Sequence, residues 1–278
     1  MITTLQWMLR IWLTGRLSRN DIASIEAGLL ETQAIDLPQD VTIYAEYTEG
    51  GNTVEAEKVV SIFAICPSGS ALQFDGQNDY VETTTLSGID WPITISVWIK
   101  AQELNFHQSI FGRNKGTSGG YYYENWLSIG GDNYDKVRFG DRLGGGGDPF
   151  VYSISPIEKD KWYHVAVTRA SASGVRIYIN GVLDNSGSTI DYDNSGKNYR
   201  IGTINTGHYP FNGKIDEVAV FNRALSAEEI RALMHTKLTG DEPNLVAYWD
   251  FDEGEGQVAG DLSPYDNDGR LGKDAGSR

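Results

Sequence analysis

From Ala71 onward, short runs of alternating apolar and polar residues follow one another, separated by turns rich in Gly, Asn and Asp. A period of two is typical of a β-strand with one buried face. Many short strands at regular spacing predict an antiparallel sandwich or jelly roll, and argue against alternating strands and helices. The runs are ALQFDG, YVETTTL, ITISVWIK, SIFGR, WLSIGG, KVRFG, WYHVAVTRA, VRIYING, YRIGTI and KIDEVAVF.

Two short motifs predict local structure within this pattern. Asn180-Gly181, between VRIYI and VLDN, predicts a β-hairpin because both residues accept the positive φ of a type I′ turn. Ser226 and Glu229 have the spacing of a capping box before AEEIRALMH. The sequence therefore predicts one helix among the strands, with Ser226 as its N-cap residue.

Residues 1–66 have a different pattern of apolar and polar residues, which predicts a small α+β unit. Apolar residues alternate over 5–13, which favours a strand, whereas those over 19–34 recur at helical spacing behind a capping residue. Two alternating runs, VTIYAEY and TVEAEKVVSIFAI, flank the turn at 49–52 and predict a hairpin. Residues 67–70, Pro-Ser-Gly-Ser, then predict a linker.

Charge and cysteine content exclude several classes of protein. The net charge is −15 and the pI is near 4.6, so a nucleic acid or an anionic membrane would be repelled. Cys66 is the only cysteine, which leaves no internal disulfide. The apolar start is a poor signal peptide and is too short and mixed to cross a bilayer. We expect no membrane insertion, and a site of action at an extracellular surface or in a virion.

The ordered motifs resemble those of a known family. ALQFDGQNDYVE, ITISVWIK, KWYHVAVT, RIYINGVL, YRIG and FNGKIDEVAVFNRALSAEEIRAL are similar to the successive strands of laminin G-like jelly rolls, in the concanavalin A-like lectin/glucanase superfamily. The resemblance covers residues 71–272. It implies a mainly β fold of two antiparallel sheets, a jelly-roll sandwich preceded here by the α+β unit, with ligands on the concave face or the rim loops.

One part of this resemblance is displaced along the chain. LVAYWDFDEGEG and DLSPYDNDGRLG resemble a segment that precedes the FDG strand in many members, but here they follow the helix. They either begin a truncated second repeat or close the same jelly roll with a strand at 244–253. We favour closure, because a lone strand would expose an unpaired edge and its apolar side chains. Residues 273–278 are left as a tail.

The acidic stretch DFDEGE superficially resembles the catalytic strand of glycan-cleaving relatives. Asp250 occupies the position where such a strand has its nucleophilic Glu. Side chains alternate along a strand, so Asp250 and Asp252 share one face while Glu253 and Glu255 take the other. Unless Gly254 introduces a bulge, no acid then lies opposite a nucleophile, and we expect no enzymatic activity.

The resemblance also implies a structural calcium ion near the FDG and IDE strands. Carboxylate and amide oxygens at flexible spacing suit Ca²⁺. The same residue types favour turns without any metal, and that alternative stays open. The matching residues are Asp75, Asp79 and Asp216, with Asp266 and Asn267 of the YDNDG loop.

Aromatic and polar residues between the predicted strands are the candidate ligand-binding residues. Flat rings can stack on the C–H faces of sugars, and carboxylates and amides accept hydrogen bonds from hydroxyl groups. Such residues serve equally well in a core or in a subunit contact. The candidates are Tyr121, Tyr123, Trp126, Asp132, Asn133 and Tyr134.

The sequence thus predicts a non-catalytic binding or adhesion module that recognises carbohydrate or a glycosylated surface. The alternative is a structural or decoration subunit of a particle such as a phage virion, in its capsid or tail. In that case residues 1–66 would anchor the chain by protein assembly, which includes assembly with copies of itself, and would display the lectin-like domain.

Overall fold

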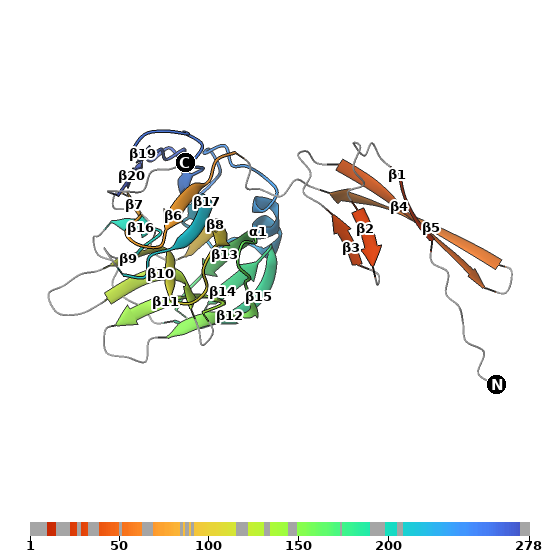
Figure 1. Ribbon diagram of the computed structural model, residues 1–278, viewed down its shortest axis with the longest axis horizontal. Helices are drawn as coiled ribbons and strands as arrows, with labels where there is room; N and C mark the ends of the chain where they lie inside the picture. The colour runs from red at the N-terminus through yellow and green to blue at the C-terminus, as the bar shows by residue number, and fades with distance from the viewer. Residues whose placement is uncertain are drawn as a thin grey trace. The chain divides into compact units, whose positions relative to one another are not determined.

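The computed structural model divides the chain into two compact units, Met1–Ile65 and Cys66–Arg278 (Figure 1). Each unit is described by itself. The residues that the structure describes are 10–14, 23–26, 29–32, 39–49, 52–62, 69–83, 86, 89, 92–114, 122–130, 134–143, 149–172, 174–189, 198–204 and 208–272.

The first unit contains a three-stranded antiparallel sheet with the order β1 (Arg10–Thr14), β4 (Gln39–Glu49) and β5 (Asn52–Ile62). Glu49 pairs with Asn52, so Gly50 and Gly51 alone connect β4 to β5. Glycine accepts the positive φ angles that two-residue hairpin loops require. The hairpin predicted around residues 49–52 is confirmed.

The helix predicted over 19–34 is wrong. In its place, β2 (Ala23–Glu26) pairs with β3 (Leu29–Thr32) in a second hairpin, and Glu26 lies opposite Leu29. Gly28 lies inside the predicted helix, where a glycine costs about 1 kcal/mol relative to alanine. A glycine-containing pair between two short strands favours a hairpin loop instead. The described residues of the first unit are all in strands.

Two antiparallel sheets form the second unit, as the jelly-roll pattern predicted. The eight-stranded sheet has the order β12 (Phe150–Pro156), β11 (Lys136–Leu143), β10 (Tyr122–Gly130), β9 (Gln108–Asn114), β16 (Tyr199–Ile201), β7 (Val81–Thr83), β20 (Gly269–Leu271) and β19 (Val258–Ala259). The seven-stranded sheet has the order β15 (Val182–Gly187), β14 (Val175–Ile179), β13 (Tyr163–Arg169), β8 (Ile93–Ala101), β17 (Asn212–Phe221) and β18 (Leu245–Trp249), and β6 (Leu72–Asp75) also pairs with β17.

The main core lies between the two sheets. Phe111, Leu127 and Phe139 contribute from the eight-stranded sheet, and Val97 and Val167 from the seven-stranded sheet. All are almost completely buried. Burying a side chain of this size stabilises the fold by about 1.5–3 kcal/mol, so the alternation read from the sequence is the main source of stability.

The single helix of the described residues, α1 (Ala227–Leu233), covers the outer face of the seven-stranded sheet (Figure 1). Its capping box is confirmed. The Ser226 hydroxyl accepts from the Glu229 backbone N–H at 3.2 Å, and the Glu229 carboxylate accepts from the Ser226 N–H at 2.8 Å. Ile230 packs with Tyr178, Phe221 and other buried side chains in a second apolar cluster. No described helix is both long and apolar enough to span a bilayer.

The C-terminal segment adds strands to both sheets. Along one edge of β17, β6 pairs with residues 212–215 and β18 pairs with residues 218–221. The chain then crosses to the other sheet, where β20 pairs with β7. The hairpin predicted at Asn180-Gly181 is also confirmed, with φ of 50° and 72° at the two residues.

A buried ionic network joins the two sheets at one end of the sandwich. Arg169 of β13 approaches Asp141 of β11 at 3.0 Å and donates to the side-chain oxygen of Asn125 on β10 at 2.9 Å. Asp141 also accepts from the backbone N–H of Asn125 at 2.8 Å. Burial raises the pKa of Asp141, while the charge of Arg169 opposes that shift. Burying these two charges costs desolvation energy. Their mutual attraction can offset that cost because strands of both sheets keep the two side chains in contact.

The stability of the seven-stranded sheet is expected to depend on Gly213. This residue has a φ of +140°, and a Cβ added there would lie 2.1 Å from the Lys100 carbonyl oxygen of β8. We expect Gly213→Ala to lower the free energy of unfolding by about 3 kcal/mol or more, measured by urea denaturation. Gly254 also has a positive φ, +74°, but meets nothing within 4 Å. Gly254→Ala is therefore the control and should cost only about 1–2 kcal/mol. Equal losses would contradict the steric explanation.

Candidate functional site

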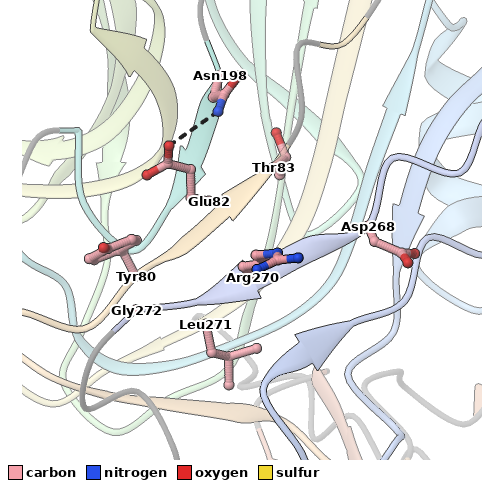
Figure 2. A pocket seen from close by; sticks show the side chains of 8 residues that line it. All are labelled: Tyr80, Glu82, Thr83, Asn198, Asp268, Arg270, Leu271 and Gly272. Atoms are coloured by element: carbon pink, nitrogen blue, oxygen red, sulfur yellow. Dashed lines mark hydrogen bonds between the residues drawn. The ribbon is translucent and has the colours of Figure 1, made fainter.

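A polar pocket of about 440 Å³ opens on the outer face of the eight-stranded sheet (Figure 2). One wall comes from β7 and the residues beside it, and the other from β20, which the C-terminal segment places against β7. The lining residues are Tyr80, Glu82, Thr83, Asn198, Asp268, Arg270, Leu271 and Gly272.

A row of three charged side chains crosses the strands at this pocket. Glu82 on β7 lies opposite Arg200 of β16 on one side and opposite Arg270 of β20 on the other. Both Nε and Nη2 of Arg200 donate to Glu82 Oε2, at 3.1 and 2.7 Å. The Asn198 amide donates to Glu82 Oε1 at 3.1 Å, as the dashed line in Figure 2 marks. Glu82 is thus fixed in place by two neighbours.

Tyr80 supplies the aromatic surface of the pocket. The guanidinium carbon of Arg200 lies 4.5 Å from the centre of its ring, in a cation–π contact. The Gly272 backbone N–H donates to the Tyr80 carbonyl oxygen at 2.7 Å. A Cβ at Gly272 would lie 2.4 Å from the Tyr80 ring, so the absence of a side chain there lets the ring pack against the strand. Tyr80 is held from two sides.

The predicted ligand-binding residues occupy different places. Tyr123 and Trp126 are only 1% exposed, within strand β10, and pack with Ile204 in a small apolar cluster. The Trp126 indole N–H donates to the Ser109 hydroxyl at 3.1 Å. Tyr134 is half-buried, and its ring lies 4.9 Å from that of His107. The remaining candidates, Tyr121, Asp132 and Asn133, lie outside the described residues.

Tyr123 and Trp126 are therefore core side chains and do not offer open faces for stacking. The sequence placed them in a loop, whereas β10 lies between β9 and β11. Trp126 is packed against Phe150 and Tyr209, which come from other segments, and the guanidinium of Arg138 lies 4.5 Å from both the Trp126 and Phe150 rings.

Sequence reasoning missed Glu82, Arg200 and Arg270. The signal was present, because each is the charged residue at an outward position of a short strand, in YVET, YRIG and GRLG. What the sequence does not show is that these three strands lie side by side in the order β16, β7 and β20.

The residues predicted to bind calcium lie at three separate places. The Asp79 carboxylate accepts from the Asp75 backbone N–H at 2.8 Å, within one turn beside β6. Asp75 pairs with Asn212, so Asp216 lies farther along β17, past the other end of β6. At the third place, the Asn267 side chain donates to the Val246 carbonyl oxygen at 2.8 Å. Asp266, the residue before it, is exposed.

These five residues do not fit a single calcium site. Across the described part of the chain, no group of three or more His, Cys, Asp or Glu side chains is arranged to hold a metal ion. Asp75 and Asp79 instead make the backbone hydrogen bonds of a turn, which is the other role that their residue type favours. Calcium binding by other means stays a prediction of the family resemblance.

Asp216 belongs to a buried acidic group where the C-terminal segment meets β17. The neighbouring Glu217 carboxylate accepts from the Tyr248 hydroxyl. Lys237 bridges the carboxylates of Asp250, at 2.9 Å, and Asp252. Hydrogen bonds to both acids raise the pKa of Lys237 although burial lowers it. The sequence predicts that the side chains of Asp250 and Asp252 point the same way, and their common contact with Lys237 is consistent with this.

Burial, with a smaller contribution from the charge of Glu217, raises the pKa of Asp216 to about 9. Burial also raises the pKa of Glu217 to about 7, although the hydrogen bond from Tyr248 opposes this. Asp216 and Glu217 are only 1% and 8% exposed. Both carboxyl groups therefore bind a proton more tightly in the folded protein than in the unfolded chain, where the pKa values are about 4.

The protein should consequently lose stability as the pH rises. Between about pH 4 and the raised pKa values, the folded state holds more protons than the unfolded state, so the free energy of unfolding falls with increasing pH. Asp216→Asn keeps the acceptor for the Glu217 N–H and removes the titration. We expect it to reduce the difference in unfolding free energy between pH 5 and pH 8 by at least about 1 kcal/mol. Asp241→Asn, at an exposed position, is the control. An unchanged pH dependence in Asp216→Asn would contradict the assignment.

The burial of Trp126 predicts a structural effect of its removal. Trp126→Ala should lower the free energy of unfolding by about 3–5 kcal/mol, because it leaves a cavity under Tyr209 and Phe150. Tyr265 is 59% exposed, and Tyr265→Ala should change stability by less than about 0.5 kcal/mol. Thermal or urea unfolding measures both. A Trp126→Ala variant as stable as the wild type would show that the indole is not packed as described.

Solved structures of low sequence identity are similar to this chain to different degrees. A protein of Bacteroides ovatus, provisionally assigned as carbohydrate-binding, matches 96% of this chain and 80% of its own, with 20% identity and a TM-score of 0.59. A heptameric SAP-like pentraxin of Limulus polyphemus matches 59% of this chain and 81% of its own, with 18% identity and a TM-score of 0.42. The Ruminococcus gnavus sialidase CBM40 bound to α2,3-sialyllactose matches 60% and 97%, with 18% identity and a TM-score of 0.48. The TM-scores of the last two structures are too low to support any inference about function.

A family model gives the firmer assignment. No curated protein matches the chain in sequence. The model of the concanavalin A-like lectin/glucanases superfamily, however, matches residues 75–231, which is more than half of the chain. This range runs from the end of β6 into α1, and the two sheets have the arrangement that the resemblance implied. The chain belongs to the concanavalin A-like lectin/glucanases superfamily.

Proposed function

We propose that this chain is a non-catalytic carbohydrate-binding module and that the pocket between β7, β16 and β20 holds the sugar. One observation carries the proposal. An open pocket on the outer face of the eight-stranded sheet combines the ring of Tyr80 with the fixed polar groups of Glu82 and Asn198. A sugar offers an apolar C–H face to such a ring and hydroxyl groups to such donors and acceptors.

The pocket groups are held in position without a ligand. Glu82 is fixed by Arg200 and Asn198, and Tyr80 by Arg200 and Gly272. Side chains that are already ordered lose little entropy on binding, which favours affinity for a small polar ligand. Membership of the superfamily and the shared fold of the Bacteroides ovatus protein are consistent with this role. They support it weakly, since a fold hosts many functions.

Binding without hydrolysis fits the placement of the acids. Glycan hydrolysis needs two carboxyl groups beside the bond, one of them with a raised pKa. Asp216 and Glu217 have raised pKa values but are buried in the other sheet, out of reach of a glycan. Glu82 and Asp268 line the pocket, but Glu82 is engaged by Arg200 and Asp268 accepts from the Asp261 backbone N–H. A glycosylated surface bound in this way would make the chain an adhesion module. The particle-subunit alternative draws no support from the relatives above and is not part of the proposal.

A glycan array followed by calorimetry tests this proposal. We expect the wild type to bind a defined set of oligosaccharides and Tyr80→Ala to weaken binding at least about tenfold, which corresponds to 1.4 kcal/mol. Tyr265→Ala removes an equally large ring from an exposed site outside the pocket and should bind like the wild type. An array without hits, or a Tyr80→Ala variant of full affinity, would refute the sugar site. Release of reducing ends from a bound oligosaccharide would refute the non-catalytic role.

A further inference from the structure

Among the described residues, Arg270 is the one cation that lines the pocket. In Figure 2 its side chain lies between Tyr80 and Asp268. It makes no hydrogen bond or ion pair with any described residue. Resting on the proposed function, we infer that the bound sugar carries a carboxylate and that Arg270 recognises it.

Glu82, the acid next to Arg270 in the row of charged side chains, forms its ion pair with Arg200. Glu82 lies directly opposite Arg270 across the β7–β20 pair. One of its carboxylate oxygens accepts two hydrogen bonds from Arg200, and the other accepts from Asn198. The charge of Glu82 is thus balanced on the β16 side of the row. The five N–H donors of Arg270 remain for a ligand.

Asp268 does not take the place of Glu82. It lies two residues before Arg270 and one residue before β20, and both side chains line the same pocket. Its Oδ1 accepts from the backbone N–H of Asp261 at 2.9 Å, and it forms no ion pair with Arg270. Asp268 offers its remaining oxygen to a hydroxyl group of the ligand.

Several described arginines have no carboxylate partner, among them Arg176, Arg231 and Arg270, and they differ in their surroundings. The net charge is −15, and Arg113, Arg169 and Arg223 all have carboxylate partners. Arg176 on β14 is exposed and also has no partner among the described residues, but it lines neither of the described pockets. Among the described arginines, only Arg270 combines a guanidinium without a partner with a pocket that already holds an aromatic ring and fixed acceptors.

The guanidinium favours a carboxylate over a hydroxyl group. Its planar fork matches the two oxygens of a carboxylate in parallel hydrogen bonds, and a charged partner makes these bonds about twice as strong as neutral ones. The aromatic ring of Tyr80 can hold the sugar face while Arg270 binds the acid. The chemistry fits a uronic acid, or another sugar acid, within a glycan.

The test compares oligosaccharides of equal length and linkage built from glucose, glucuronic acid or glucose 6-sulfate, by calorimetry at low salt. We expect the wild type to bind the glucuronic acid form about tenfold more tightly than the glucose form. Arg270→Gln should bring this ratio to about one. Arg270→Lys keeps the charge but not the fork and should retain a smaller preference. Arg176→Gln removes the same charge from the other sheet and should keep the wild-type ratio.

The outcomes separate the inference from the function on which it rests. Binding of none of the three oligosaccharide types, with an empty glycan array, would refute the sugar site itself. Equal affinity of the wild type for the glucose and glucuronic acid forms would overturn the inference alone. So would a preference that survives in Arg270→Gln. Tighter binding of the sulfated form than of the carboxylate form would overturn the assignment of a sugar acid. Circular dichroism of each variant confirms that it is folded.

Discussion

The backbone pairing of the C-terminal segment is the constraint on which the rest of the second unit depends. β18 fills the part of the β17 edge that β6 leaves open, and β20 then pairs with β7 in the opposite sheet. Unpaired N–H and C=O groups at sheet edges are costly when buried and prone to association when exposed, so this pairing protects two edges at once. Trp249 and Phe251 belong to the same segment and are fully buried in the main core. The segment thus supplies hydrogen bonds, apolar packing and one wall of the pocket.

Polar groups inside this sandwich are arranged in two different ways. At one end, Arg169 and Asp141 neutralise each other across the sheets. On β17, Asp216 and Glu217 are adjacent buried acids, and Lys237 is paired with two other acids. Burial and the charges of neighbouring acids both disfavour the ionised carboxylates. The pKa values of Asp216 and Glu217 are therefore raised. The second arrangement makes the stability of the fold depend on pH.

The sequence was a good guide to local structure and to the fold, and a poor guide to the site. The hairpin at Asn180-Gly181 and the capping box at Ser226 depend on residues that are close in the sequence, so both could be predicted from it. The helix predicted over 19–34 failed because periodicity outweighed the single glycine that interrupts it. Trp126 was misplaced because its burial depends on Phe150 and Tyr209, which are distant in the sequence. The pocket could not be predicted, since Glu82 and Arg270 meet only through a strand pairing that spans most of the domain.

The pocket also has an unusual origin in the chain. Tyr80, Glu82 and Asn198 lie within the range that the family model matches, whereas Asp268 and the strand β20 with Arg270 lie beyond its end at residue 231. The residues matched by the family model therefore form only one of the two walls. Substitutions on the short β20 strand could alter what the pocket recognises without disturbing the residues that define the family. Relatives with the same signature strands could then differ in ligand, and a comparison of family motifs alone would not reveal it.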